Sequence, residues 1–440
     1  MSSADGFDAV VVGSGPNGLV GAVTLAESGM RVLVLEAADQ WGGGLRTEEL
    51  TLPGFRHDVC SSVHPLALAS PAFRAIGLER DGLQWAQPKI PLAHPVEHSS
   101  PESVVLERSV ERTAAGLGVD AARWERWFGP LIAQAEPMVD MILNPLRVPP
   151  PSVWTTLGRF GLLGVRSASS LSRSLKGDRA RSLLAGNSAH SILDLSQPVT
   201  GGFGLLLTLL AHSHGWPVAV GGSQSIADAL VQRLRSLGGS IELGSPVKSL
   251  ADVPACPNVL LDITPRQVLK IAGNRLPSRY AHSLAKYRYG PGVFKVDWAL
   301  DGPAPWIDRK AWDAGTVHLG GSFREIEESE RAVQNGRHPE RPFVLYVQAT
   351  AADPSRAPAG QHTGWAYCHV PNGSTVDMTA AIEAQVERFA PGFRDRVLAR
   401  QVTGPAALEA HNANLVGGDI GGGVADIRQL IARPVLSPRP

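Results

Sequence analysis

The sequence has few cysteines, no excess of either charge and no long apolar run. Its three cysteines, Cys60, Cys256 and Cys368, stand far apart and form no CxxC pair. This spacing argues against a disulfide framework or a zinc site and suits a reducing compartment. Lysine plus arginine and aspartate plus glutamate number 41 each, so the net charge gives no indication of a nucleic-acid partner.

No apolar run reaches the roughly 18 residues that a membrane-spanning helix needs. The nearest to that length, residues 201–211, is interrupted by glycines. It predicts either a buried core helix or a segment that dips into lipid, so peripheral membrane contact stays open. The N-terminus carries acidic residues in place of a basic region with an apolar run, which disfavours a signal peptide. We therefore expect a cytoplasmic protein without a transmembrane segment.

The stretch from Phe7 to Glu36 predicts a strand, a glycine turn, a helix and a second strand. Gly13 permits a tight turn, Gly15 lets the backbone approach a pyrophosphate, and Gly18 lets the helix pack on the strand. Free N–H groups at the helix N-terminus favour the anion. Glu36 follows at roughly the 20 residues that place an acid on a ribose hydroxyl. A glycine turn without a ligand would not need that acid, so the stretch predicts dinucleotide binding.

A second glycine-rich loop, residues 41–47, follows the second strand. A loop in that position lies over the crevice where the cofactor binds, which favours a cofactor role over a plain flexible turn. The next segment, residues 53–65, carries His57, Asp58 and His64. Each could act as a general base, although such side chains beside strands are more often satisfied polar groups.

The middle of the chain predicts mainly helices. Residues 71–150 and 152–215 show helical apolar spacing and meet at a proline-dense stretch, which indicates a boundary inside a helical insert. His212 and His214 resemble metal ligands only in their spacing, because no carboxylate or cysteine cluster accompanies them. We expect no metal site.

A second α/β segment follows at residues 220–263. It predicts a helix over residues 226–237, short strands over residues 240–243 and 246–250, and an apolar strand over residues 259–263. The segment lacks a glycine fingerprint of its own. It therefore predicts the second half of one discontinuous cofactor domain and not another Rossmann unit.

Strands with a period of two dominate the region after residue 290. Residues 294–300 alternate between an apolar face and a face that carries Lys295 and Asp297. Residues 343–348 and 364–370 repeat the strand signal. Residues 375–390 predict a helix with Glu383, Glu387 and Arg388 on its solvated face. These elements predict a mixed antiparallel sheet with a helix on one side.

The expected fold class is α/β, with a discontinuous Rossmann-like cofactor domain and an inserted substrate domain of mixed sheet plus helices. The cofactor domain would comprise residues 1–72, 216–272 and 401–440. The substrate domain would comprise residues 73–215, the helical insert, and residues 273–400.

These motifs together resemble the FAD-dependent phytoene-desaturase-like (carotenoid/retinoid) oxidoreductases, and among them the pyridine nucleotide-disulphide oxidoreductase domain-containing protein two group. Besides the glycine motifs, four phrases carry the resemblance, which covers nearly the whole chain. They are residues 51–58 (TLPGFRHD), 289–298 (YGPGVFKVDW), 388–393 (RFAPGF) and 417–420 (GGDI).

The resemblance implies FAD as the cofactor and hydride transfer from an apolar small molecule to the flavin. Oxygen, a quinone or another carrier would be the final electron acceptor. The flavin, not a side chain, would accept the hydride, so no catalytic residue is predicted. The implied cofactor-binding residues are Gly13, Gly15, Pro16, Asn17, Gly18, Glu36, Gly43, Gly44, Arg46 and Val247.

In the family that the chain resembles, a last strand and helix complete the FAD domain. Here the sequence stops at Pro440 before that element, so we expect a truncated FAD domain with an open sheet edge and weak FAD binding. Three alternatives follow. They are a flavin-poor or inactive scaffold that acts through protein contacts, a flavin amine oxidase, and a nicotinamide dehydrogenase. The substrate and the oligomeric state cannot be predicted.

Overall fold

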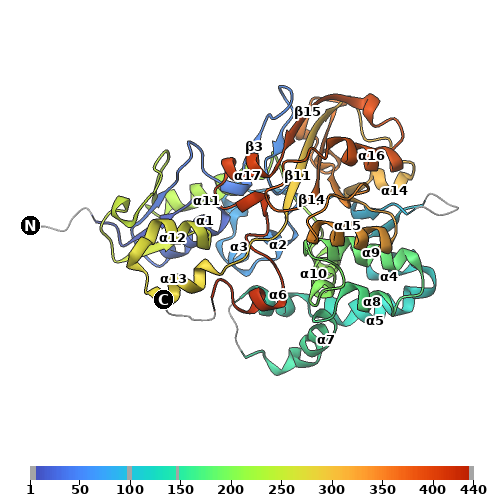
Figure 1. The fold of residues 1–440 in the computed structure, drawn as a ribbon, viewed down its shortest axis with the longest axis horizontal. Coiled ribbons are helices and arrows are strands. Elements are labelled where there is room, and N and C mark those ends of the chain that lie inside the picture. The colour runs from blue at the N-terminus through green and yellow to red at the C-terminus, as the bar shows by residue number, and fades with distance from the viewer. Residues whose placement is uncertain (1–5, 97–101, 145–147, 436–440) are drawn as a thin grey trace, which may run out of the picture.

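The computed structural model describes residues 6–96, 102–144 and 148–435. The expectation about the chain end falls on residues 436–440, which lie outside the described residues. Three layers can be followed in Figure 1. The parallel sheet with α1, α11 and α12 lies on the left, a larger sheet lies at the upper right, and helices lie below that sheet.

The parallel sheet is built from two distant parts of the chain. Its strands are β1 (Ala9–Val12), β2 (Val32–Leu35), β9 (Ser240–Glu242) and β10 (Asn258–Leu261), in the order β10-β1-β2-β9. β1 and β2 are apolar runs buried on both faces, as a sheet between covering helices requires. The pairing of β1 with β10 confirms that residues 220–263 complete the first glycine unit.

Two helices cover one face of this sheet. α1 (Pro16–Glu27) and α11 (Gln224–Ser236) share an apolar core that includes Leu19, Val23 and Leu230. α12 (Pro265–Ala272) and α13 (Ser278–Ala285) follow β10. The strand expected over residues 246–250 is wrong: residues 246–249 belong to no strand, and Leu250 begins a 3₁₀ turn. Val247 packs instead against Val10 and Leu33.

The larger sheet has seven strands in the order β15-β11-β14-β13-β12-β6-β7. β12 and β6 are parallel and the other neighbours are antiparallel. β15 crosses the expected domain boundary at residue 400, so residues 401–403 lie in this sheet. The helical insert also contributes β6 and β7, which helical spacing did not predict. The strands are β6 (Ile90–His94), β7 (Val104–Leu106), β11 (Gly292–Leu300), β12 (Ala314–Leu319), β13 (Val344–Val347), β14 (His362–Val370) and β15 (Val397–Thr403).

The two faces of the seven-stranded sheet have different coverings. On one face, Val296, Trp298 and Tyr346 pack against α16 (Thr379–Phe389). The solvated position expected for Glu383 on α16 is wrong, because this carboxylate is buried and accepts a hydrogen bond from Trp298 Nε1 at 3.1 Å. On the other face, β11 turns Lys295 and Asp297 into the protein, so all nine residues of β11 are buried.

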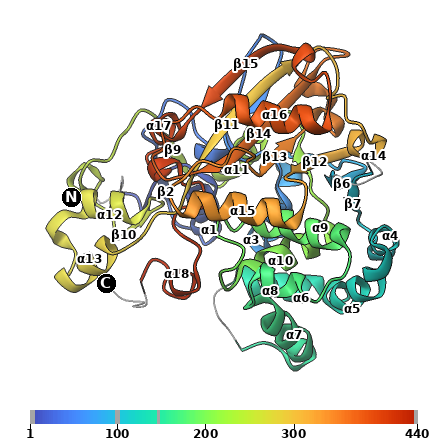
Figure 2. The same cartoon turned by 45° about the vertical axis from the view of Figure 1, so that its right-hand side comes forward.

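The helical layer packs beneath that second face. α15 (Phe323–Gln334) lies between the sheet and α9, as Figure 2 shows. The core of the layer includes Trp124, Phe128 and Leu209. Its helices are α4 (Val110–Ala115), α5 (Ala121–Ile132), α6 (Ala135–Leu143), α7 (Trp154–Gly164), α8 (Ala168–Ser172), α9 (Asp178–Ala189) and α10 (Thr200–Ser213).

Short elements connect the three layers. Two small antiparallel sheets pair β3 with β4 and β5 with β8. The β5–β8 pair joins the helical insert to the second half of the cofactor domain. These elements are β3 (Thr47–Glu48), β4 (His57–Asp58), β5 (Trp85–Ala86), β8 (Val218–Ala219), α2 (Pro65–Ala69), α3 (Pro71–Ile76), α14 (Arg309–Trp312), α17 (Pro405–His411) and α18 (Ile427–Ile431).

Candidate functional site

The two glycine-rich loops lie against each other at the end of the parallel sheet. Gly42 N donates to Ser14 O at 3.1 Å. A Cβ added at Gly43 would lie 3.0 Å from Gly15 Cα, so the two main chains approach more closely than side chains would allow. The second loop therefore sits over the first, where the sequence predicted it.

Gly15 and Gly18 serve different purposes. A Cβ at Gly18 would lie 2.3 Å from Gly13 O, so only glycine lets α1 pack on β1. Gly15 has φ −64°, which any residue can adopt, and an added Cβ there would meet only Asp262 Oδ2 at 3.2 Å. The fold requires glycine at position 18 but leaves position 15 to a close-approaching ligand.

Two carboxylates flank this loop. Glu36 accepts hydrogen bonds from Ser14 N and Ala38 N, both at 2.9 Å, and from the Ser14 hydroxyl. Asp262, at the end of β10, accepts from Gly18 N at 2.8 Å, and burial raises the pKa of its carboxyl. Sequence reasoning assigned no role to Asp262, because β10 and the glycine turn meet only in the folded chain.

The other predicted cofactor residues lie at different depths. Pro16, Asn17 and Gly44 line the large cavity described next. Arg46 is buried beside it, donates to Gln40 O at 2.7 Å, and keeps its Nε without a partner. Val247 stands apart from the cavity, on the adjoining sheet face.

A cavity of about 680 Å³ runs from the glycine loops onto the seven-stranded sheet. The glycine loops, the segment 59–70, the sheet, the helical layer and the segment 408–420 all contribute to its wall, and most of the wall is apolar. Its lining includes Pro16, Asn17, Gly44, Cys60, His64, His190, Leu207, Trp216, Val293, Lys295, Thr316, Leu345, Val347, Trp365, Tyr367, Leu408, Leu415 and Ile420.

Lys295 is the only cationic side chain on the cavity wall among the described residues. It forms a buried ion pair with Asp297, and its Nζ lies 5.6 Å from the Trp365 ring centroid. Burial raises the pKa of Asp297 to about 6 even though Lys295 opposes the shift. Asp297 Oδ1 lies 3.6 Å from His57 Nδ1. Burial lowers the pKa of His57 to about 3, and its ring stays neutral.

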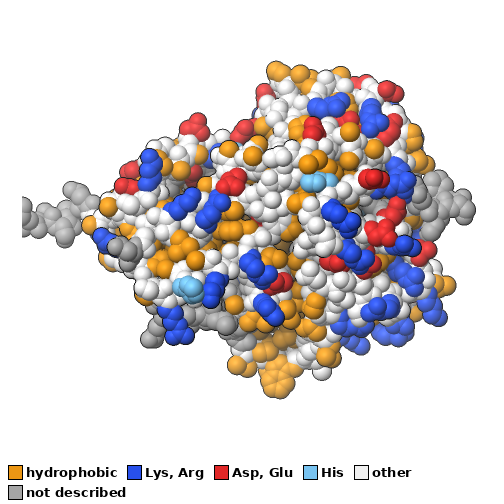
Figure 3. All heavy atoms as spheres, in the orientation of Figure 1, with side chains coloured by type: hydrophobic (Ala, Val, Ile, Leu, Met, Phe, Trp, Pro, Cys, Tyr) orange, Lys and Arg blue, Asp and Glu red, His pale blue; other side chains and the backbone are white. Residues whose placement is uncertain are grey.

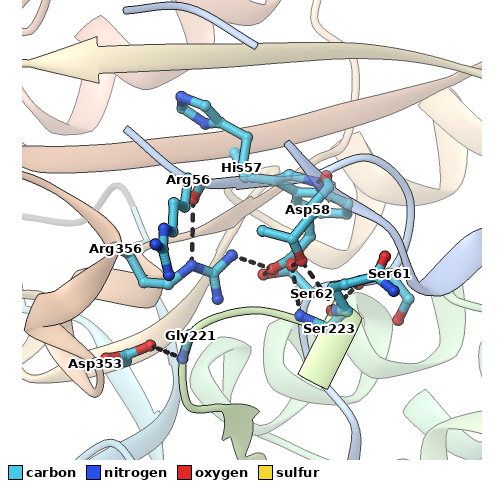
Figure 4. Close-up of polar contacts among 12 residues, drawn as sticks. Arg56, His57, Asp58, Ser61, Ser62, Gly221, Ser223, Asp353 and Arg356 are labelled. Atoms are coloured by element: carbon cyan, nitrogen blue, oxygen red, sulfur yellow. Dashed lines mark hydrogen bonds and ion pairs between the residues drawn. The ribbon is translucent and has the colours of Figure 1, made fainter. Parts of the chain in front are cut away.

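Asp58 points to the opposite side of β4 from His57, as Figure 4 shows. Its carboxylate accepts from Arg356 Nη2 at 2.5 Å, Ser62 Oγ at 2.6 Å and Ser223 N at 2.8 Å. Burial alone would raise the pKa of Asp58, but Arg356 and these donors lower it to about 2. The carboxylate therefore joins β4, the start of α11 and the turn that carries Arg356.

Of the general-base candidates, only His64 reaches the cavity wall. His64 Nε2 hydrogen-bonds Ser223 Oγ at 2.8 Å, and burial lowers its pKa to about 4. His57 and Asp58 are absent from the wall; Asp58 is a fully hydrogen-bonded polar group, whereas His57 bonds Thr51 Oγ1 through Nε2 at 2.8 Å and its Nδ1 has no hydrogen-bond partner. His212 receives a hydrogen bond from Trp124 Nε1. In the described part of the chain, no cluster of three or more possible ligand residues could hold a metal ion.

Comparisons with known proteins agree with this geometry. A family model described as an NAD(P)-binding Rossmann-like domain matches residues 11–76, the segment that contains both glycine-rich loops. The pyridine nucleotide-disulfide oxidoreductase domain-containing protein 2 of Rattus norvegicus is 24% identical over 98% of this chain and 86% of its own length. Phytoene dehydrogenase of Streptomyces griseus is 26% identical over 89% of this chain and 77% of its own length.

A third relative matches over a shorter stretch. One component of the limonene dehydrogenase of Castellaniella defragrans is 30% identical over 145 residues, which are 33% of this chain and 26% of that component's own length. Together these matches support the resemblance that the motifs predicted: the chain is similar to phytoene dehydrogenase and to the pyridine nucleotide-disulfide oxidoreductase domain-containing protein 2.

Solved structures share the fold. An oxidoreductase from Methanosarcina mazei superposes with a TM-score of 0.60 at 16% identity, covering 95% of this chain and 97% of that one. A putrescine oxidase variant superposes with a TM-score of 0.58 at 16% identity, covering 94% of this chain and 88% of that one. The fold is therefore that of known oxidoreductases. No helix among the described residues is both long and apolar enough to cross a membrane.

Proposed function

We propose that the protein is an FAD-dependent oxidoreductase that takes a hydride from an uncharged, apolar small molecule. The supporting observation is the single cavity that leads from the glycine loops to the apolar face of the seven-stranded sheet. A dinucleotide held at the loops and a substrate on the sheet would share one continuous space. The two bound molecules would then lie next to each other, as hydride transfer requires.

The residues present fit an extended dinucleotide. Gly15 leaves space that a Cβ would fill, and the N-terminus of α1 offers the Asn17 N–H to a phosphate. Gly13, Gly15, Pro16, Asn17 and Gly18 would hold the pyrophosphate, Glu36 the ribose, Val247 the adenine, and Gly43, Gly44 and Arg46 the flavin side. A bound FAD would supply a ring that accepts a hydride, while oxygen, a quinone or another carrier would reoxidise it.

The chain's own side chains would orient the substrate and keep charge away from it. No acidic side chain lines the cavity among the described residues, and the Lys295 ammonium is neutralised by Asp297. An amine substrate would find no carboxylate there. The Trp365 and Tyr367 rings meet edge to face at 89°, with centroids 5.3 Å apart, so they do not form two parallel aromatic walls. These features favour an apolar substrate over an amine.

We further propose that α7 touches a membrane surface from which an apolar substrate could come. Leu162 is 75% exposed and Trp154 is 57% exposed, and Figure 3 shows hydrophobic side chains gathered at the lower tip, where α7 lies. Basic residues with exposed Trp and Leu are typical of helices that lie in an anionic interface. Between Asp140 and Asp178 the chain has no acidic residue but carries Arg147, Arg159, Arg166, Arg173 and Lys176.

The visible spectrum of the purified protein tests the main proposal. We expect a yellow protein that releases FAD on denaturation and is bleached anaerobically by an apolar alcohol or alkene. A protein that stays colourless after incubation with excess FAD would favour the scaffold alternative. A released nicotinamide nucleotide would favour a nicotinamide dehydrogenase, and bleaching by amines alone would favour an amine oxidase.

A further inference from the structure

The cavity floor has two polar ends separated by apolar side chains. Strand register places Lys295 of β11, Tyr367 of β14, Leu345 of β13 and His318 of β12 in one row across the sheet. Neighbouring strands lie about 4.8 Å apart, so the row is roughly 14 Å long. Lys295 marks the end beside Cys60 and the glycine loops, and β12 marks the far end.

The far end contains a polar atom that the protein leaves without a partner. Thr316, two residues before His318 on β12, is 1% exposed and lines the cavity, yet its Oγ1 makes no hydrogen bond. A buried hydroxyl without a partner is unfavourable. A ligand oxygen in the cavity would satisfy it.

His190, the C-cap residue of α9, also lines the cavity and contacts β12 at His318, two residues from Thr316. Its Nε2 lies 3.0 Å from His318 Nε2. The His318 ring is held in place because Gly186 leaves room for it: a Cβ at Gly186 would lie 2.5 Å from His318 Nδ1. Among the described residues, the His190 ring makes its one hydrogen bond through Nε2, so Nδ1 remains available to a ligand.

The far end is polar but uncharged. Burial lowers the pKa of His190 to about 3, and nearby His369 adds to the effect. Burial also lowers the pKa of His318, so neither ring is protonated near neutral pH. Glu330, the partner of His369, is occupied by its Nδ1 at 2.8 Å, and no acidic side chain among the described residues lines the cavity. A carboxylate ligand would find no cation there, and an ammonium ligand would find no free anion.

We propose that His190 and Thr316 form a hydrogen-bonding subsite for one uncharged oxygen function, a hydroxyl or a ketone, on an otherwise apolar substrate. This inference rests on the proposed function, because it names the class of substrate that the same cavity takes. The subsite lies at the opposite end of the floor from Lys295. It would orient the substrate by its distal oxygen.

Ligand binding tests the subsite without a need for turnover. Trp216 and Trp365 line the cavity, so tryptophan fluorescence can report titration with p-menthane, menthol, menthone and p-menthane-3-carboxylate. We expect menthol and menthone to bind at least about tenfold more tightly than p-menthane, because a site built for a hydrogen bond discriminates against analogues that lack it. The carboxylate should bind no better than p-menthane.

Two variants and one control sharpen the test. The preference for menthol is the ratio of its affinity to that of p-menthane. Thr316→Val and His190→Phe should each bring this ratio close to one, while the affinity for p-menthane stays within about twofold of the wild-type value. The control is Thr363→Val. Thr363 is buried and lies on the same face of β14 as Trp365 but does not line the cavity, so this variant should bind all four ligands as the wild type does. Equal affinities in the wild type, tighter binding of the carboxylate, or an unchanged preference in both variants would overturn the subsite.

The flavin spectrum of the same preparation separates the two proposals. A colourless protein that prefers menthol would contradict the proposed function and support the subsite. A yellow protein without the preference would contradict the subsite alone.

Discussion

The two sides of the cavity are constructed in different ways. On the nucleotide side, the wall depends on backbone: Gly15 and Gly43 bring two main chains together, and the requirement is for absent side chains. On the substrate side, the wall depends on side chains from four strands, including Lys295 and Thr316, whose charges and hydroxyls are buried. The first kind of site is local in sequence, whereas the second exists only after distant segments meet.

The largest expected loss of stability comes from breaking the hydrogen bonds and ion pair of the buried Asp58 carboxylate. Arg356→Met would leave the Asp58 carboxylate buried without its cation, and loss of one partner of a buried pair costs about 3–5 kcal/mol. Chemical denaturation would measure the free energy of unfolding. Arg324→Met, which breaks the exposed Arg324–Glu328 pair on α15, serves as control and should leave the free energy of unfolding unchanged within the error of the measurement. A loss below about 1 kcal/mol in Arg356→Met would contradict the role given to Asp58.

A smaller effect should separate the two glycines of the nucleotide side. Gly18→Ala forces a Cβ against Gly13 O and should lower the free energy of unfolding by about 1–3 kcal/mol. Gly15→Ala should leave stability nearly unchanged and, if FAD binds as proposed, weaken its binding about tenfold or more, because the added Cβ would occupy the space proposed for the pyrophosphate. Denaturation and flavin titration measure the two quantities.

The control for both glycine variants is Gly158→Ala on α7, where an added Cβ meets nothing within 4 Å. This variant should lower neither the free energy of unfolding nor the affinity for FAD. If Gly15→Ala binds FAD as tightly as the wild type does, the nucleotide side does not need the absence of a side chain at position 15, and our account of that side is wrong.

The smallest effect on stability and flavin content is expected from a substitution on α7, because α7 contributes to neither side of the cavity. Leu162→Asn should leave the free energy of unfolding within about 0.5 kcal/mol and leave flavin content unchanged. It should nevertheless reduce cosedimentation with vesicles of anionic phospholipid several-fold. Val376→Asn, at another exposed apolar position, is the matched control. Equal cosedimentation of wild type and Leu162→Asn would refute membrane contact through α7.

The sequence predicted the parts of the molecule whose physical requirement is local. The glycine turn, α1 and the apolar strand β2 could be predicted because each needs a recognisable residue at a fixed spacing. The alternation in β11 also predicted which residues share a face. It could not show that Lys295 and Asp297 face a protein interior, because a period of two does not tell whether the polar face meets water or a buried ion pair.

The parts that sequence reasoning missed depend on distant partners. Arg356 meets Asp58 across 298 residues of chain, and no local pattern marks it. His190 ends a helix whose composition gave no functional signal, and Thr316 is an ordinary strand threonine. The solvated position expected for Glu383 failed for the same reason, since its partner Trp298 lies on another element.

The insertion that separates β1 from β10 has a consequence for synthesis on the ribosome. β1 can pair with β2 early, but its other neighbour begins at Asn258. At about 5–20 residues per second, the intervening chain takes roughly 12–50 s to emerge. During that interval one edge of an entirely apolar strand stays unpaired, so the nascent chain depends on its surroundings to shield β1 until translation reaches its partner.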